Sequence, residues 1–206
     1  MKKPSLLSLI AAFACVALYA QTPDYRFGKV SAEELRMTSY DKDPDAAAVY
    51  LYEENSLFYQ IDREIGLTSD YRARIKILKS DGTDQANVSI PYTDEYSVRE
   101  SVFGIDAVAY NLVDGKIVKT PLKKQYIFTE QVGENHKLVK FSIPEVREGT
   151  VIEYKFRKTS KNPTYIPSFR FQHDIPVARC HMQALIPEFF KFNLNLKGYI
   201  KVNIAD

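Results

Sequence analysis

The side chains most able to carry covalent chemistry gather late in the chain, where His173, Cys180 and His181 lie within nine residues. A cysteine and a histidine can act as a nucleophile and its base. Cys180 and His181 are neighbours, however, and neighbouring side chains of a strand point to opposite faces. His173 can meet Cys180 only if the fold brings the two together. We therefore assign no catalytic residue and expect Cys180 to be a buried, inert thiol.

The same residues and His136 contain metal-binding side chains, but no pair has the short, regular spacing of a zinc site. Three aspartates alternate within Asp41–Asp45, as at the start of a calcium loop. Ala46 and Tyr52 occupy the positions where that loop has its glycine and its glutamate. We expect a solvated turn here, and we assign neither a metal nor a cofactor.

Three further patterns have both a functional and a structural interpretation. Asn87-Val-Ser89 matches a glycosylation signal but falls within a predicted strand, so we attribute it to chance. The lysines of Lys119–Lys124 can contact an acidic partner, although lysines commonly protect the edge of a sheet. Most aromatic side chains should be core, and an exposed subset could bind a sugar or a peptide. The aromatic groups in question are Tyr50, Tyr52, Phe58 and Tyr59, and Phe169, Phe171, Phe189, Phe190 and Phe192.

The elements that position these residues are predicted to be strands. Period-two alternation and turn residues divide the chain into short strands, which indicates an all-β, mostly antiparallel, sandwich-like single domain. One short helix is expected at Ala32–Met37, behind a capping box of Ser31 and Glu34. The predicted strands are 47–52, 71–78, 86–92, 105–113, 116–120, 126–132, 137–143, 151–156, 177–186 and 189–196. Asp114-Gly115 and residues 133–136 are the predicted hairpin turns. Ser80-Asp81-Gly82 is a further predicted turn, after which 86–92 is expected to be the return strand beside 71–78.

Residues 1–20 have the organisation of a secretory signal peptide. Lys2 and Lys3 precede an apolar run of about 13 residues, which is too short for a membrane-spanning helix, and a small residue, Ala20, follows. We expect cleavage after Ala20, export to the periplasm, the outer membrane or the exterior, and no transmembrane segment afterwards. A lipid anchor at Cys15 is the weaker interpretation.

Charge and length limit the class of the remaining chain, residues 21–206. The sequence has 28 basic and 26 acidic residues, so loss of Lys2 and Lys3 leaves 26 of each. The absence of a basic excess argues against a nucleic-acid partner. Residues 198–205 have the pattern of a further strand, so we expect either that this terminus pairs at a sheet edge or that the polypeptide continues past Asp206.

The chain contains a series of segments whose order is informative: Phe27–Val30 with Glu33 and Leu35, and 45–52, 74–78, 86–92, 109–112, 115–118, 140–144, 149–154 and 171–176. In this order they resemble the exported domain of unknown function that precedes transglutaminase-like domains in Bacteroidetes-type bacteria. The resemblance covers roughly residues 25–196 and implies an antiparallel β-rich domain. It also implies a papain-like Cys-His-Asp domain downstream, beyond Asp206, so no catalytic residue is transferred to this chain.

Three functions remain open from the sequence. The first is a non-catalytic exported accessory domain, which binds a protein, peptide or glycan or supports a downstream transglutaminase-like domain. The second is the N-terminal part of a transglutaminase-like cysteine peptidase or amidase. The third is a purely structural assembly domain.

Overall fold

The computed structural model describes residues 24–198 and 203–204. The predicted signal peptide, including Cys15, and most of the strand pattern at residues 198–205 lie outside the described residues. Within them, no helix is long and apolar enough to cross a membrane.

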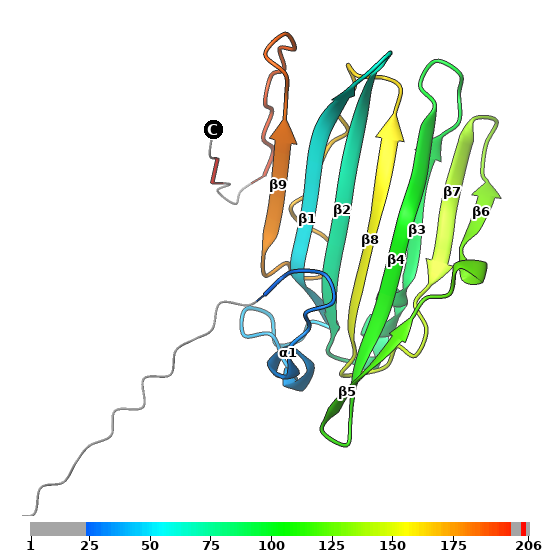
Figure 1. The fold of residues 1–206 in the computed structure, drawn as a ribbon. Coiled ribbons are helices and arrows are strands. Elements are labelled where there is room, and N and C mark those ends of the chain that lie inside the picture. Colours follow the sequence, from blue (N-terminus) through cyan, green and yellow to red (C-terminus); the bar gives the residue numbers. More distant parts are fainter. Residues whose placement is uncertain (1–23, 199–202, 205–206) are drawn as a thin grey trace, which may run out of the picture.

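The described residues form nine strands, one short α-helix and two 3-10 helices, arranged as Figure 1 shows. This confirms the all-β prediction. The elements are α1 (Ala32–Arg36), β1 (Ala48–Ile61), β2 (Ile65–Ile77), the 3-10 helix η1 (Ser80–Ala86), β3 (Asn87–Thr93), β4 (Glu100–Val113), β5 (Lys116–Pro121), the 3-10 helix η2 (Lys124–Tyr126), β6 (Phe128–Gln131), β7 (His136–Ser142), β8 (Val151–Ser160) and β9 (Cys180–Leu185).

The strands form two sheets. The larger sheet has six strands in the order β5-β4-β8-β2-β1-β9, and the smaller has three in the order β3-β7-β6. All strand pairs are antiparallel except β1 with β9, which is parallel. β9 is therefore an edge strand of the larger sheet, and Figure 1 shows it at the end of the sheet opposite β4 and β5.

The main core lies between the two sheets. Ile75 and Ile152 project from the larger sheet, where both are almost completely buried, and they belong to one apolar cluster with residues of the smaller sheet. Alternate residues of each strand supply this cluster, as expected for a sandwich with one inner face per sheet. The members from the smaller sheet are Ile90 of β3 and Val139 and Phe141 of β7.

The outer face of the larger sheet has a second core beneath the N-terminal segment. Leu35 of α1 packs with Val49 and Val151, which alternate with the inward residues of β1 and β8. The capping box predicted for α1 is present, because Ser31 accepts from the amide of Glu34 and the Glu34 side chain accepts from the amide of Ser31. The helix thus covers part of the outer face of the larger sheet.

Buried charges hold this N-terminal segment in place. Arg74 of β2 donates to Glu153 on β8 at 2.8 Å and to Glu34 on α1 at 2.7 Å. It also donates to two main-chain carbonyls, those of Asp24 and Arg26. A single guanidinium therefore ties residues 24–34 to two central strands.

Both hairpin predictions are confirmed. β4 and β5 pair around Asp114 and Gly115, whose φ angles of 49° and 74° are the positive values that a two-residue turn requires. β6 and β7 pair around residues 132–135. These turns were predictable because their chemistry is local.

Two other expectations were wrong. Residues 86–92 are a strand, but β3 does not return beside β2 and instead joins β7 in the smaller sheet. The strand predicted at 189–196 is not formed: the amide of Phe190 donates to the carbonyl of Pro187 in a turn, and these residues pair with no strand among the described residues. β9 is confirmed as a strand, although it is shorter than predicted.

The change of sheet after β2 depends on Gly82 in η1. Gly82 is buried, and a Cβ at this position would overlap the main-chain carbonyl of Ala47 at the start of β1. We expect Gly82→Ala to lower the free energy of unfolding by about 2 kcal/mol through overpacking. Urea denaturation followed by circular dichroism measures this. Gly133→Ala is the control, since its Cβ would make only ordinary contacts of 3.5 Å, and an equal loss in both variants would contradict the explanation.

Candidate functional site

The parallel pairing of β9 with β1 sets Cys180 directly beside Glu53. Glu53 is 1% exposed, although it is a carboxylate on the inner face of the sheet. An ionised buried carboxylate needs hydrogen-bond donors around it. The surrounding side chains supply them.

Three side chains converge on Glu53 from separate elements. The Tyr71 hydroxyl of β2 donates to Oε1 at 2.6 Å. The Nε2 atom of His173 lies 2.8 Å from Oε2, and the Cys180 thiol donates to Oε2 at 3.4 Å. His173 belongs to the irregular segment 161–179, so this contact ties that segment to β1. We call Glu53, Tyr71, His173 and Cys180 the Glu53 cluster.

The Glu53 cluster raises the pKa of the Cys180 thiol instead of lowering it. Burial, together with the negative charge of Glu53, raises the pKa of Cys180 to about 12. Burial likewise raises the pKa of Tyr71 far above its ordinary value, with the charges of Tyr154 and Glu53 adding to the effect. A reactive cysteine needs a lowered pKa and a neighbouring base or cation. Here the thiol donates to a carboxylate, so the thiolate is disfavoured.

The three residues His173, Cys180 and His181 do not all meet in the fold. His181 lies on the opposite side of β9 from Cys180 and is exposed, as the alternation of a strand requires. His173 and Cys180 do meet at one group, Glu53, which the sequence analysis missed. The only local signal for Glu53 was a charged residue directly after the apolar run 47–52.

The candidate metal ligands are not assembled. His136 starts β7 in the smaller sheet, and the 41–45 segment forms hydrogen-bonded turns, with Asp45 fully exposed. Within residues 24–198 and 203–204, no group of three or more His, Cys, Asp or Glu side chains could hold a metal ion. Asn87 is the exposed first residue of β3. Among the lysines of Lys119–Lys124, Lys119 is exposed on the edge strand β5, and Lys123 and Lys124 are exposed just after that strand.

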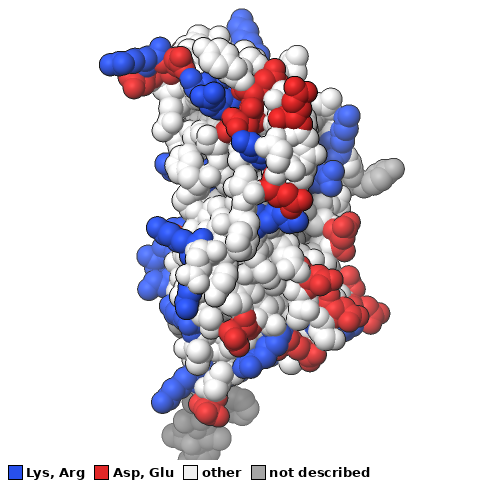
Figure 2. Space-filling model, turned by 90° about the vertical axis from the view of Figure 1, so that its right-hand side faces the viewer, with Lys and Arg blue, Asp and Glu red and all other residues white. Residues whose placement is uncertain are grey.

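The upper outer face of the larger sheet contains charges that neutralise one another. Arg157 of β8 pairs with Asp70 of β2, and Arg72 of β2 pairs with Glu54 of β1. These cross-strand pairs line an open hollow of about 420 Å³. Lys, Arg, Asp and Glu side chains are also mixed on the face shown in Figure 2. Neither the outer face of the larger sheet nor the face in Figure 2 carries charges of only one sign.

Exposed apolar side chains concentrate beside β9. Leu185, Ile186, Phe189, Phe192, Leu194 and Leu196 are between 37% and 71% exposed, and we call these six the apolar flank. A second group of exposed large apolar residues lies between the end of β4 and the turn after β6, at Val113, Ile117, Val118, Tyr126, Phe128 and Val132. The others are scattered over the rest of the described chain. A concentration of this kind is typical of an interaction surface.

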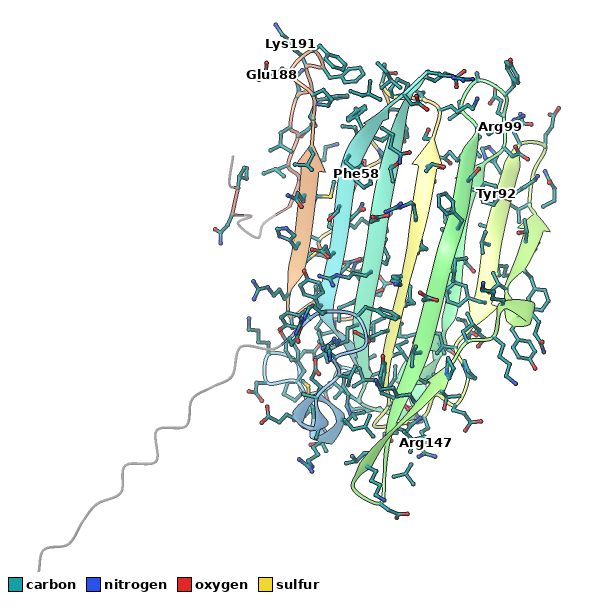
Figure 3. The ribbon with its side chains drawn as sticks, in the orientation of Figure 1. Phe58, Tyr92, Arg99, Arg147, Glu188 and Lys191 are labelled. Atoms are coloured by element: carbon teal, nitrogen blue, oxygen red, sulfur yellow. The ribbon has the colours of Figure 1, made fainter. Side chains whose placement is uncertain are left out.

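The chain turns after β9 and runs back along it (Figure 1). Glu188 and Lys191 lie at this turn, at the opposite end of the sheet from Arg147 (Figure 3). Phe190 stacks on Tyr59 of β1 with ring centroids 4.8 Å apart. A hollow of about 600 Å³ opens beside the turn, lined by Phe58, Tyr59 and residues 184–187.

The aromatic residues considered as a binding surface include a buried set and an exposed set. Tyr50 and Tyr52 are 8% exposed and belong to the structure of the sheet. Phe189 and Phe192 are 63% and 37% exposed and belong to the apolar flank. The exposed subset thus lies at the β9 edge.

The fold and the site define an all-β domain of two sheets. Its thiol has a raised pKa beside Glu53, and its apolar flank lies along β9. The chain belongs to the family described as a domain of unknown function with solved structure, DUF3857, whose pattern matches residues 66–205. None of the curated proteins compared with the sequence matches it.

Two solved structures show limited similarity. A proposed protease from Parabacteroides distasonis ATCC 8503 is 16% identical, with a TM-score of 0.49 over 65% of this chain. Yeast LTA4 hydrolase is 14% identical, with a TM-score of 0.28 over 62% of this chain. This chain spans 28% and 18% of the lengths of those two structures. Similarity at this level carries no argument about activity.

Proposed function

We propose that the chain is a non-catalytic accessory domain of an exported protein, and that it binds a protein partner at the β9 edge. The observation that carries the proposal is the Glu53 cluster. The one thiol of residues 21–206 donates to a buried carboxylate, and its pKa is about 12. Chemistry would then come from a different domain, and a transglutaminase-like domain is our candidate.

The apolar flank supports the binding part of this proposal. Its side chains remain exposed although the sandwich core nearby is closed, and β9 has no hydrogen-bonded strand on its outer side among the described residues. An edge of this kind can accept another strand through its main chain. We therefore propose protein binding in preference to glycan binding, because exposed main-chain donors and acceptors accompany the apolar side chains.

Thiol reactivity tests the non-catalytic assignment. At pH 8 a thiol with a pKa of about 12 is ionised to about one part in 10⁴, whereas an ordinary cysteine is about one quarter ionised. We expect Cys180 in folded residues 21–206 to react with iodoacetamide on the order of a thousandfold more slowly than in the urea-unfolded chain. Rates are measured by intact mass.

An activity assay completes this test. Residues 21–206 and the Cys180→Ser variant should both show no turnover of peptide or amide substrates. Rapid alkylation of the folded chain, or turnover that is lost in Cys180→Ser, would contradict the proposal and favour a catalytic thiol.

A further inference from the structure

The segment that follows β9 has the sequence of a strand without the structure of one. Phe192, Leu194 and Leu196 alternate with polar residues throughout Lys191–Lys197. This period-two pattern belongs to a strand with one buried and one wet face. In the structure every residue of this segment is exposed, and Leu194 is 71% exposed. Phe192 lies against Phe190, with ring centroids 5.9 Å apart, and is 37% exposed. The sequence therefore specifies an apolar face that the described residues bury only in part.

The main chain of this segment is equally unpartnered. The last main-chain hydrogen bond of the turn joins the amide of Phe190 to the carbonyl of Pro187. Within the part of the chain that the structure describes, no hydrogen bond involves residues 191–197. An extended segment with free donors and acceptors and alternating side chains is suited to pair with another strand.

The charge of the segment indicates the chemistry of its partner. Its polar side carries Lys191, Asn193, Asn195 and Lys197, with two positive charges and no acidic residue. Neither lysine forms an ion pair within the described residues. A partner strand with acidic residues on its polar side would complement both lysines.

We infer that Lys191–Lys197 is a docking strand that pairs with an extended protein segment in which apolar and acidic residues alternate. This inference rests on the proposed function, and it names the chemistry of the partner. Phe192, Leu194 and Leu196 bury against the apolar residues of the partner. Lys191 and Lys197 face its carboxylates, and the main chains form the ladder.

Defined peptides test the inference with residues 21–206. The probe is a capped 12-residue peptide of alternating valine and glutamate, and two matched peptides replace glutamate by lysine or valine by serine. We expect only the valine–glutamate peptide, added at saturation, to slow amide hydrogen exchange at residues 191–197, by at least tenfold. Higher salt should weaken this binding.

Two variants separate the contributions of charge and apolar contact. Lys191→Glu with Lys197→Glu should reverse the preference, so that the valine–lysine peptide binds better. Leu194→Asn should weaken binding about tenfold without loss of stability, because the side chain is already exposed. On the opposite edge, the exposed residues Lys116, Lys123 and Val118 provide the controls, as Lys116→Glu with Lys123→Glu and as Val118→Asn. These controls should bind like the unaltered chain.

Three outcomes would overturn the inference: no protection of residues 191–197 by any peptide, equal protection by the glutamate and lysine peptides, or protection that depends on protein concentration alone. The last outcome would identify the segment as an interface between copies of this chain. An inert Cys180 together with any of these results would leave the accessory function intact and refute only the docking strand. A reactive Cys180 would refute the non-catalytic assignment. The peptide experiment would then still decide whether residues 191–197 form a docking strand.

Discussion

Replacement of Arg74 by methionine is expected to lower the free energy of unfolding by about 3 to 5 kcal/mol, because it leaves Glu153 buried without its counter-charge. Glu153 is 2% exposed, and Arg74 is 2% exposed. Glu153 would retain hydrogen bonds from the Tyr110 hydroxyl at 2.9 Å and from the Gly28 amide at 2.8 Å. Neither donor replaces the positive charge. The N-terminal segment should also lose its attachment at Glu34.

Urea denaturation followed by circular dichroism measures this loss. Arg157→Met is the matched control, since its ion pair with Asp70 is 40% exposed on both sides and should contribute less than about 1 kcal/mol. Arg74→Met combined with Glu153→Leu should destabilise less than the sum of the two single changes, because no buried charge then lacks its partner. Equal losses for Arg74→Met and Arg157→Met would contradict the role assigned to the buried network.

Lys76 is expected to make the free energy of unfolding depend on pH in the alkaline range. Its side chain is fully buried, and its ammonium group donates to the carbonyls of Leu35 and Gly149. Burial lowers the pKa of Lys76 from 10.5 to about 8. Between these two values the unfolded chain binds a proton that the folded chain does not, so the contribution of Lys76 to stability rises with pH.

The difference in unfolding free energy between the unaltered chain and Lys76→Met should therefore shift by about 2 to 3 kcal/mol in favour of the unaltered chain from pH 7 to pH 10. The comparison with the variant is needed because burial raises the pKa values of Tyr50, Tyr71 and Tyr110, which lowers stability above about pH 10 in both proteins. Urea denaturation at four pH values provides the data. A difference that stays constant with pH would show that Lys76 keeps an ordinary pKa in the fold.

The sequence predicted the elements whose causes are local. The capping box of α1 and the Asp114-Gly115 hairpin each depend on residues within a few positions of one another, and both are present. The antiparallel, sandwich-like class followed from alternation along single strands. The sequence did not predict the partner of β3, because the choice between β2 and β7 depends on packing between η1 and the start of β1.

The Glu53 cluster was beyond sequence reasoning for a related physical reason. It joins positions 53, 71, 173 and 180, which lie on three strands and an irregular segment. Only the parallel register of β1 with β9 sets the carboxylate beside the thiol. Cys180 was predicted to be a buried, inert thiol, and the structure leaves it only partly buried, so its inertness stays a prediction. The carboxylate of Glu53, which helps to raise the pKa of this thiol, was not foreseen.

The segment 191–197 differs from both cases. Its alternation predicted a strand, and the described residues provide no strand to pair with it. A local pattern without its long-range counterpart is expected where a chain meets another chain or another domain. This mismatch supports the binding part of the proposed function, at the β9 edge, whereas the Glu53 cluster carries the non-catalytic part.

Amide hydrogen exchange of residues 191–197 in the natural protein is the most direct test of this function. The protein is purified from its own cells under mild conditions, with whatever polypeptide it carries or binds, and is compared with residues 21–206 alone. The account predicts exchange at least tenfold slower at 191–197 in the natural protein and little change at the β5 edge. Equal exchange at 191–197 in the two samples would contradict the claim that the β9 edge binds a protein partner.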